Sequence, residues 1–254
     1  MTPMDSDSSS LISLPVEGNL LHDCMGNWRR GEACLTTWTP AADTEFESFS
    51  FEAFQELSER AAGWLQEAGL SEKDVVILLV KDPALLMVAF WGAVLRGAVP
   101  AILAYPNFKM NREKYAFGLQ GVTSRTGARL VVIDSGFPPD LQEMIHLPAG
   151  SALREISRTS IDAANPLEIH PSITPDSPVL LQHSAGTTGL QKGVVLNHRQ
   201  VLRQLRKLAR YLELDLTDCF VSWLPLYHDM GLIACFLLPL VTGLPMVVQA
   251  PDDW

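Results

Sequence analysis

The sequence predicts an α/β protein in which layered sheets are flanked by helices. Two short apolar runs, 75–80 and 99–103, have the continuous hydrophobic character of buried parallel strands. Segments with helical spacing of apolar residues separate such runs, and this alternation of strand and helix is typical of a parallel α/β sheet. The 254 residues, 47% hydrophobic and 19% charged, suffice for a packed core in one large or two small domains.

The first helices are predicted from periodicity and from the residues that cap them. Apolar residues over 54–68 recur at helical spacing, and Gly69 follows as a stop signal. Asp82 and Pro83 are the residue types of an N-cap and a first helical position, so a second helix is expected from there to Gly97.

The next part of the chain continues this alternation and then loses it. A helix is expected over 111–124 and a strand over 129–133. Prolines are frequent and periodicity is weak over 135–178. This predicts a loop-rich connection with a short helix near Leu141 and a strand near 153–156.

The stretch 181–193 carries the strongest chemical signal. Between two apolar runs stand three glycines, three hydroxyl side chains and one cation: Gly186, Gly189, Gly193, Ser184, Thr187, Thr188 and Lys192. Glycines let backbone amides turn toward an anion, while hydroxyls and a lysine add donors and charge. A Walker loop is excluded, because Lys192 follows Gln191 and precedes Gly193. The pattern predicts a loop that binds the triphosphate of a nucleotide. The alternative is a glycine-rich hairpin without a ligand.

The segment 231–250 carries no charge and is long enough to cross a bilayer. Pro239, Gly243 and Pro245 interrupt it, so a helix to about Val241, a turn and a strand over 246–248 are expected instead of a membrane span.

Composition excludes several other classes of protein. The formal net charge of −10 argues against nucleic-acid binding. The four cysteines lack the short paired spacing of a zinc site or a disulfide framework, which favours a reducing, cytoplasmic compartment. The acidic, serine-rich start has no basic or apolar region of a signal peptide, and residues 1–15 are expected to be a disordered tail.

A second motif, Val-Ser-Trp-Leu-Pro-Leu-Tyr-His-Asp-Met-Gly-Leu, occupies residues 221–232. It resembles the Leu-Pro-Leu-aromatic-His-x-x-Gly motif of the adenylate-forming, or AMP-binding, superfamily. Residues 184–193 resemble the signature loop of the same superfamily, except that Gln191 replaces the usual proline. Within the superfamily the chain resembles fatty acyl-AMP ligases and acyl-CoA synthetases most, on residues 227–233 and on the short phrases 104–106 and 253–254.

This resemblance covers about residues 30–254 and implies an incomplete N-terminal domain of the adenylate-forming fold. It implies a lead-in over 16–53 that belongs to a second subdomain, a first α/β subdomain over 54–215, and a truncated start of the second subdomain over 216–254. The C-terminal domain is expected to be absent. An exposed apolar surface is expected where the missing half would pack, formed by Phe236, Leu237, Leu240 and Val247.

The resemblance also implies an enzyme that joins a fatty or related carboxylic acid to ATP, forming acyl-adenylate. The acyl group would pass to the phosphopantetheine thiol of an acyl carrier protein. One alternative is an acyl- or aryl-CoA ligase, and a second is a truncated, non-catalytic homologue that binds a nucleotide or a partner. Mg²⁺ is expected as a cofactor with its ligand outside this chain, so this chain alone is expected to be inactive.

Individual roles follow from matching the two motifs to the family. The resemblance implies that the ATP phosphates are bound by Ser184, Ala185, Gly186, Thr187, Thr188, Gly189, Lys192 and Gly193. It also implies that the carboxylic acid is bound by Trp223, Tyr227, His228, Met230 and Gly231. The expected catalytic residues are Lys192, which neutralises phosphate charge or anchors the loop, and His228, which closes over the acyl site. No metal ligand is expected.

Between the two motifs, Asn197 is predicted to cap a helix that reaches about Leu212. One face carries Arg199, Arg203, Arg206 and Arg210, and the opposite face carries Val201, Leu202, Leu205, Leu208, Ala209 and Leu212. This is typical of a solvated face over a core face. The alternative is an electrostatic patch for an acidic carrier protein.

Overall fold

A computed structural model describes residues 12, 14, 21, 31–38, 46–167, 172–183 and 192–250. In chain order the elements are β1 (Ala33–Trp38), β2 (Phe46–Ser50), α1 (Phe51–Glu67), β3 (Val75–Leu79), α2 (Pro83–Leu95), β4 (Val99–Ile102), α3 (Arg112–Arg125), β5 (Leu130–Ile133), α4 (Pro139–Gln142), β6 (Ala152–Glu155), α5 (Arg158–Asp162), β7 (Pro178–His183), β8 (Gly193–Asn197), α6 (His198–Tyr211), β9 (Phe220–Ser222), η2 (Met230–Leu237), α7 (Leu238–Thr242) and β10 (Met246–Gln249). The predicted disordered tail lies almost wholly outside these residues.

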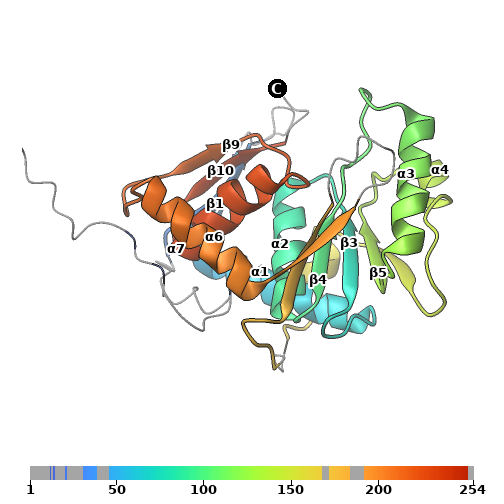
Figure 1. The fold of residues 1–254 in the computed structure, drawn as a ribbon, viewed down its shortest axis with the longest axis horizontal. Coiled ribbons are helices and arrows are strands. Elements are labelled where there is room, and N and C mark those ends of the chain that lie inside the picture. Colours follow the sequence, from blue (N-terminus) through green and yellow to red (C-terminus); the bar gives the residue numbers. More distant parts are fainter. Residues whose placement is uncertain are drawn as a thin grey trace, which may run out of the picture.

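The first sheet has the order β4-β3-β5-β6, and all its pairs are parallel. Side chains alternate between two cores along β3. Val76 and Leu78 join the core that contains α1 and α2, whereas Ile77 and Leu79 join the core beneath α3 and α4. Helices therefore cover both faces of the sheet (Figure 1), which explains its continuous apolar strands and confirms the predicted layered α/β class.

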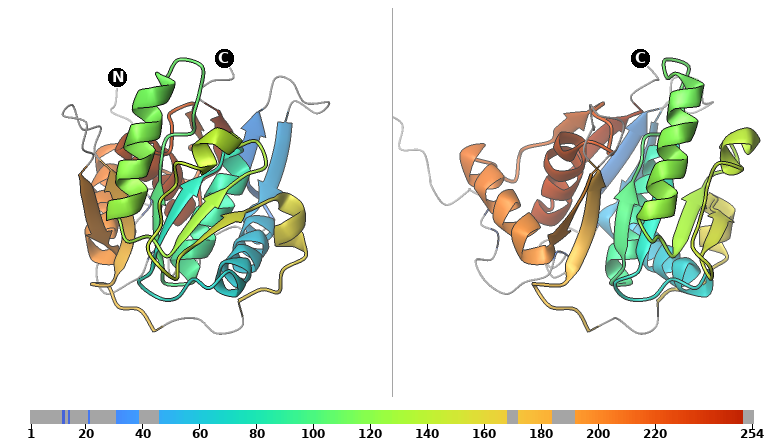
Figure 2. Two further views of the ribbon diagram at one scale, coloured as in Figure 1. Left: turned by 90° about the vertical axis from the view of Figure 1, so that its right-hand side faces the viewer. Right: turned by 45° about the vertical axis from the view of Figure 1, so that its right-hand side comes forward.

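The second sheet joins the two ends of the described chain, with the order β2-β1-β10-β9. Strand β1 pairs parallel with β10 and antiparallel with β2, and β10 pairs parallel with β9. Figure 2 shows these strands on the opposite side of α2 from the first sheet. The subdomain boundaries expected at residues 53/54 and 215/216 stay a prediction.

Helix α2 is apolar all round and buried from Ala84 to Leu95, as its place between the sheets requires. Phe236 of η2 packs edge-to-face on Phe54 of α1 and Phe90 of α2, with ring centroids 6.4 and 5.8 Å apart. The expectation of an exposed apolar surface was therefore wrong for Phe236, Leu237 and Leu240, which are fully buried, and Val247 is half-buried.

The contact between α1 and α2 depends on a small residue at Gly92. A Cβ there would lie 2.8 Å from Ala61 Cβ, 2.9 Å from Ala62 N and 2.9 Å from Ser58 O. We expect Gly92→Ala to force the two helices apart and to destabilise the fold by about 1–3 kcal/mol.

The matched control is Gly118→Ala in α3, where an added Cβ meets nothing within 4 Å. It should stabilise the protein by roughly 0.5–1 kcal/mol through helix propensity alone. Urea unfolding of both variants measures the difference, and equal stabilities would show that the helix contact is not close-packed.

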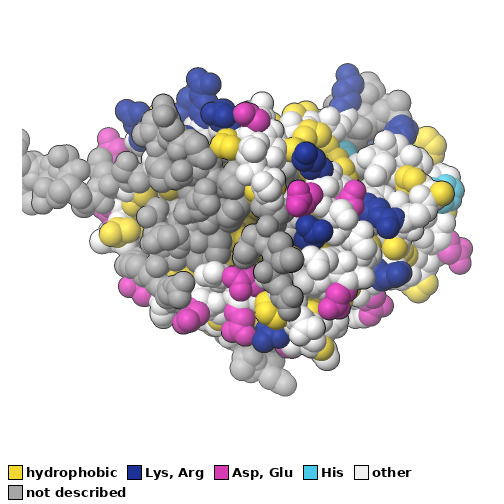
Figure 3. Space-filling model, turned by 90° about the horizontal axis from the view of Figure 1, so that it is seen from below, with side chains coloured by type: hydrophobic (Ala, Val, Ile, Leu, Met, Phe, Trp, Pro, Cys, Tyr) yellow, Lys and Arg dark blue, Asp and Glu magenta, His cyan; other side chains and the backbone are white. Residues whose placement is uncertain are grey.

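Helix α6 begins where predicted, with a reciprocal capping box between Asn197 and Gln200. Most of its predicted apolar face is buried (Val201, Leu202, Leu205 and Ala209), and Arg203 and Arg210 are exposed, as an amphipathic surface helix requires. The prediction was wrong for Leu212, which follows the helix and is exposed, and Leu208 is half-buried. Figure 3 shows Lys and Arg side chains gathered at the margin of the molecule on the side of α6, while acidic and basic side chains intermix elsewhere on that face. That the arginine face of α6 binds an acidic carrier protein stays a prediction.

Two details differ from the sequence expectations. The helix expected to reach Val241 is an eight-residue π-helix, η2, followed by the short α7. The helix α5 has no counterpart among the expected elements; it begins at a capping box between Ser157 and Ser160. Within the described residues, no helix is both long and apolar enough to cross a bilayer.

Candidate functional site

The two ends of the glycine-rich loop are held together by the hairpin of β7 and β8. These strands pair antiparallel with His183 opposite Gly193, so the chain leaves and returns at the same place. Ser184, Ala185, Gly186, Thr187, Thr188 and Gly189 lie outside the described residues, and their phosphate role stays a prediction. Lys192 is exposed at the base of the loop, next to Gly193.

The second motif folds as a tight connection between β9 and η2. The amide of His228 donates to Pro225 O over 3.1 Å, and Leu232 N donates to His228 O over 2.9 Å. A Cβ on the buried Gly231 would lie 2.4 Å from Pro225 O, so only glycine fits against this turn.

The two motifs meet at the end of β7. Gln182, one residue before the last of that strand, donates from Nε2 to Tyr227 O over 2.7 Å. A side chain at the base of the predicted phosphate loop therefore supports the motif assigned to the carboxylic acid. Their contact joins residues 45 positions apart in the sequence.

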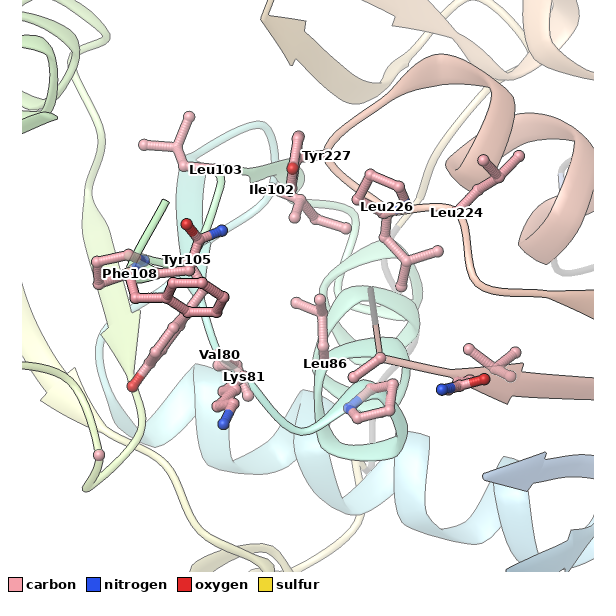
Figure 4. A pocket seen from close by; sticks show the side chains of 18 residues that line it. Val80, Lys81, Leu86, Ile102, Leu103, Tyr105, Phe108, Leu224, Leu226 and Tyr227 are labelled. Atoms are coloured by element: carbon pink, nitrogen blue, oxygen red, sulfur yellow. The ribbon is translucent and has the colours of Figure 1, made fainter. Parts of the chain in front are cut away.

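A cavity of about 500 Å³ lies beside this contact (Figure 4). Its walls come from the ends of β3, β4 and β10, from the start of α2 and from the second motif, chiefly Val80, Leu86, Ile102, Leu103, Leu226 and Val248. The carboxyl ends of parallel strands are where open α/β sheets usually bind ligands. Its size and apolar character fit a small organic ligand.

The five residues assigned to the acid have different surroundings. Tyr227 is half-buried and lines the cavity, and its ring centroid lies 5.0 Å from that of His228. His228 is exposed, as are Trp223 (58%) and Met230 (60%). The structure thus places one of these aromatic rings at the cavity and leaves the other three side chains at the surface, where their substrate roles stay predictions.

Sequence reasoning missed Lys81 and Tyr105 as cavity residues. Each follows an apolar run that was correctly identified as a strand, and both lie at the carboxyl edge of the first sheet. That position was the available signal, since the edge is a preferred ligand site.

A hydrogen-bonded carboxylate supports this edge. Asp134 accepts hydrogen bonds from Lys81 N (2.6 Å), Tyr105 Oη (2.8 Å) and Gly136 N (3.1 Å). Burial and the hydrogen bond to this carboxylate raise the pKa of the Tyr105 phenol, so it remains protonated near neutral pH. Asp134 therefore fixes the Tyr105 side chain in the cavity wall.

Burial lowers the pKa of the His183 imidazole, just before the loop. In the unfolded chain this group takes up a proton near pH 6.5, whereas the fold resists protonation. Its contribution to stability is therefore present above that pH and is lost as the pH falls.

We expect the free energy of unfolding to fall between about pH 7.5 and about pH 5.5, and to fall less in His183→Gln. Urea unfolding at both values checks this. An identical pH dependence in wild type and variant would contradict it.

Comparison with known proteins adds to this geometry. A medium-chain-fatty-acid–[acyl-carrier-protein] ligase from Teredinibacter turnerae is 42% identical over 83 residues, covering 33% of this chain and 13% of that protein. A 4-coumarate–CoA ligase from Oryza sativa is 26% identical over 228 residues, covering 82% and 38%. The chain spans between 13% and 38% of the length of these two curated relatives.

A solved structure from a study of fatty acyl-adenylate ligases from E. coli and L. pneumophila has a TM-score of 0.78 and 22% identity. The match covers 94% of this chain and 43% of the solved one, and it shows that the fold is shared. Residues 31–253 match the family described as AMP-binding enzyme. This match spans well over half of the sequence, and the chain belongs to that family.

Proposed function

We propose that this chain is part of a ligase that activates a fatty or related carboxylic acid with ATP. The observation that carries the proposal is the contact between Gln182 and Tyr227. It places the base of the glycine-rich loop against the motif that lines the apolar cavity. A triphosphate held by the loop and an acyl chain held in the cavity would then meet near this contact.

In the proposed reaction a carboxylate oxygen attacks the α-phosphorus of ATP, and the bond to the departing pyrophosphate breaks. Negative charge on the β- and γ-phosphates needs preorganised donors. We assign this role to Thr187, Thr188, the amides of Gly186 and Gly189, and Lys192. Mg²⁺ would accompany the ATP. The described residues contain no group of three His, Cys, Asp or Glu that could hold a metal, so we assign no step to it.

For the second half-reaction we propose transfer to the phosphopantetheine thiol of a carrier protein. The relative from Teredinibacter turnerae is named for that acceptor, whereas the one from Oryza sativa is named for CoA. A non-catalytic homologue is the third alternative. We place the protein in the cytoplasm, which agrees with the free cysteines Cys34, Cys219 and Cys235.

Pyrophosphate exchange tests the first half-reaction, using the whole protein that carries this chain and a series of fatty acids. Mass spectrometry after addition of a carrier protein or of CoA identifies the acceptor. Exchange followed by acyl-carrier formation supports the proposal, acyl-CoA formation supports the alternative, and no exchange with any acid would leave the non-catalytic homologue.

His228→Ala tests whether His228 acts at the acyl site. His228 is exposed beside Tyr227, which lines the cavity, so the variant should change the KM for the acid and selectivity between acids, with the KM for ATP nearly unchanged. Exchange measured against both substrates separates these effects. A collapse in ATP affinity with unchanged acid selectivity would place His228 at the nucleotide instead.

A further inference from the structure

The two ends of the apolar cavity differ in chemistry. Among the described residues that line it, Lys81 alone carries a formal charge at neutral pH. In Figure 4, Tyr227 lies above the middle of the view and Lys81 below it, with Ile102 and Leu86 at heights between them. Tyr227 lies at the end nearest the predicted phosphate loop, because its carbonyl accepts the hydrogen bond from Gln182. Lys81 therefore marks the far end, away from the proposed chemistry.

A second cavity, of about 490 Å³, adjoins the first at this far end. The two share Lys81, Pro83, Tyr105, Gly136 and Ala250. The rest of the second lining is mostly polar and includes Asp82, Asp134, Ser157 and Arg158. At this end, polar side chains that can form hydrogen bonds therefore adjoin the apolar cavity.

The carboxylates of the second cavity already have donors. Asp134 accepts three hydrogen bonds, including those from the Lys81 amide and the Tyr105 phenol. Asp82 caps α2 by accepting from Leu85 N over 2.6 Å, and Glu47 pairs with Arg158 over 3.2 Å. In contrast, the Lys81 ammonium forms no ion pair or hydrogen bond with another residue of the described chain. An ammonium offers three donors and no acceptor, so its complement is an oxygen.

We infer that the carboxylic acid substrate carries an oxygen-bearing group at its far end, a hydroxyl or a second carboxylate, which accepts a hydrogen bond from Lys81. This inference rests on the proposed function, because it takes the apolar cavity as the acyl site. An unsubstituted chain would place its methyl end beside an ammonium and polar walls, whereas an oxygen-bearing end finds a charge-assisted donor there.

The test compares decanoic acid with its ω-hydroxy and ω-carboxy analogues in pyrophosphate exchange by the whole protein. Wild-type kcat/KM should be about tenfold or more higher for at least one oxygen-bearing acid than for decanoic acid. Lys81→Met keeps an unbranched side chain one atom shorter and removes its charge. It should raise the KM for that acid roughly ten- to a hundredfold, and it should not raise the KM for decanoic acid, whose methyl end no longer meets an ammonium. The control is Lys114→Met, which removes an exposed lysine of α3 that lines neither cavity.

The outcomes separate the inference from the proposed function. Exchange with decanoic acid but no preference for an oxygen-bearing end overturns the inference alone, as does a Lys81→Met effect that is absent or equal for all three acids. No exchange with any acid overturns the proposed function as well. If only the ω-carboxy acid responds to Lys81→Met, the group recognised is an anion; if only the ω-hydroxy acid responds, it is a neutral acceptor.

Discussion

Lys192→Ala is expected to slow acyl-adenylate formation about ten- to a hundredfold, because a lost charge-assisted contact is worth roughly 1.5–3 kcal/mol. Lys192 is exposed at the base of the loop, directly before the strand that pairs with β7. From there its ammonium can neutralise charge that develops on the departing pyrophosphate. Fatty-acid binding should change little, since Lys192 does not line the apolar cavity.

Pyrophosphate exchange measures the loss, and Lys192→Arg should retain part of the rate because it keeps the charge. Lys207→Ala is a matched control, since it removes an exposed lysine from the polar face of α6. An unchanged exchange rate in Lys192→Ala, with ATP and acid saturating, would remove this residue from the phosphate site.

Gly231→Ala is the second change with a large expected effect. The added Cβ would meet three backbone atoms, Pro225 O at 2.4 Å, Pro225 C at 2.9 Å and Leu224 O at 3.0 Å. None of them can rotate away as a flexible side chain can, so the turn that carries the cavity wall must move. We expect a loss of about 1–3 kcal/mol in stability, as overpacking usually costs, and a higher KM for the acid.

Unfolding in urea and exchange at varied acid concentration measure the two effects separately. Gly118→Ala again serves as the control, since nothing lies within 4 Å of the added atom. A Gly231→Ala variant with wild-type stability and an unchanged KM for the acid would show that the turn does not shape the cavity.

Local signals were enough to locate most helices and the strands of the first sheet. The helix expected over 54–68 is Phe51–Glu67, and its cap is Ser50, whose side chain accepts from Ala53 N. The strand expected over 75–80 is Val75–Leu79. These elements follow from apolar periodicity and from caps, which depend on residues close in the chain.

Pairings between distant segments could not be derived in this way. Strand β1 pairs with β10, which places Leu35 beside Met246, and no periodicity specifies which strands become neighbours. Phe236 was expected at the surface because the missing half of the second subdomain was expected to cover it, whereas the packing of η2 on α1 and α2 buries it completely.

For the candidate site, too, local sequence signals predicted one part and contacts between distant segments decided the other. The sequence by itself determined the two motifs, because glycines, hydroxyls and a lysine at close spacing carry their chemistry locally. Only the tertiary structure decided that Gln182 contacts Tyr227 and that Lys81 and Tyr105 line the cavity beside them. These residues come from separate strands that end at one edge of the fold, and their proximity depends on the order and direction of those strands.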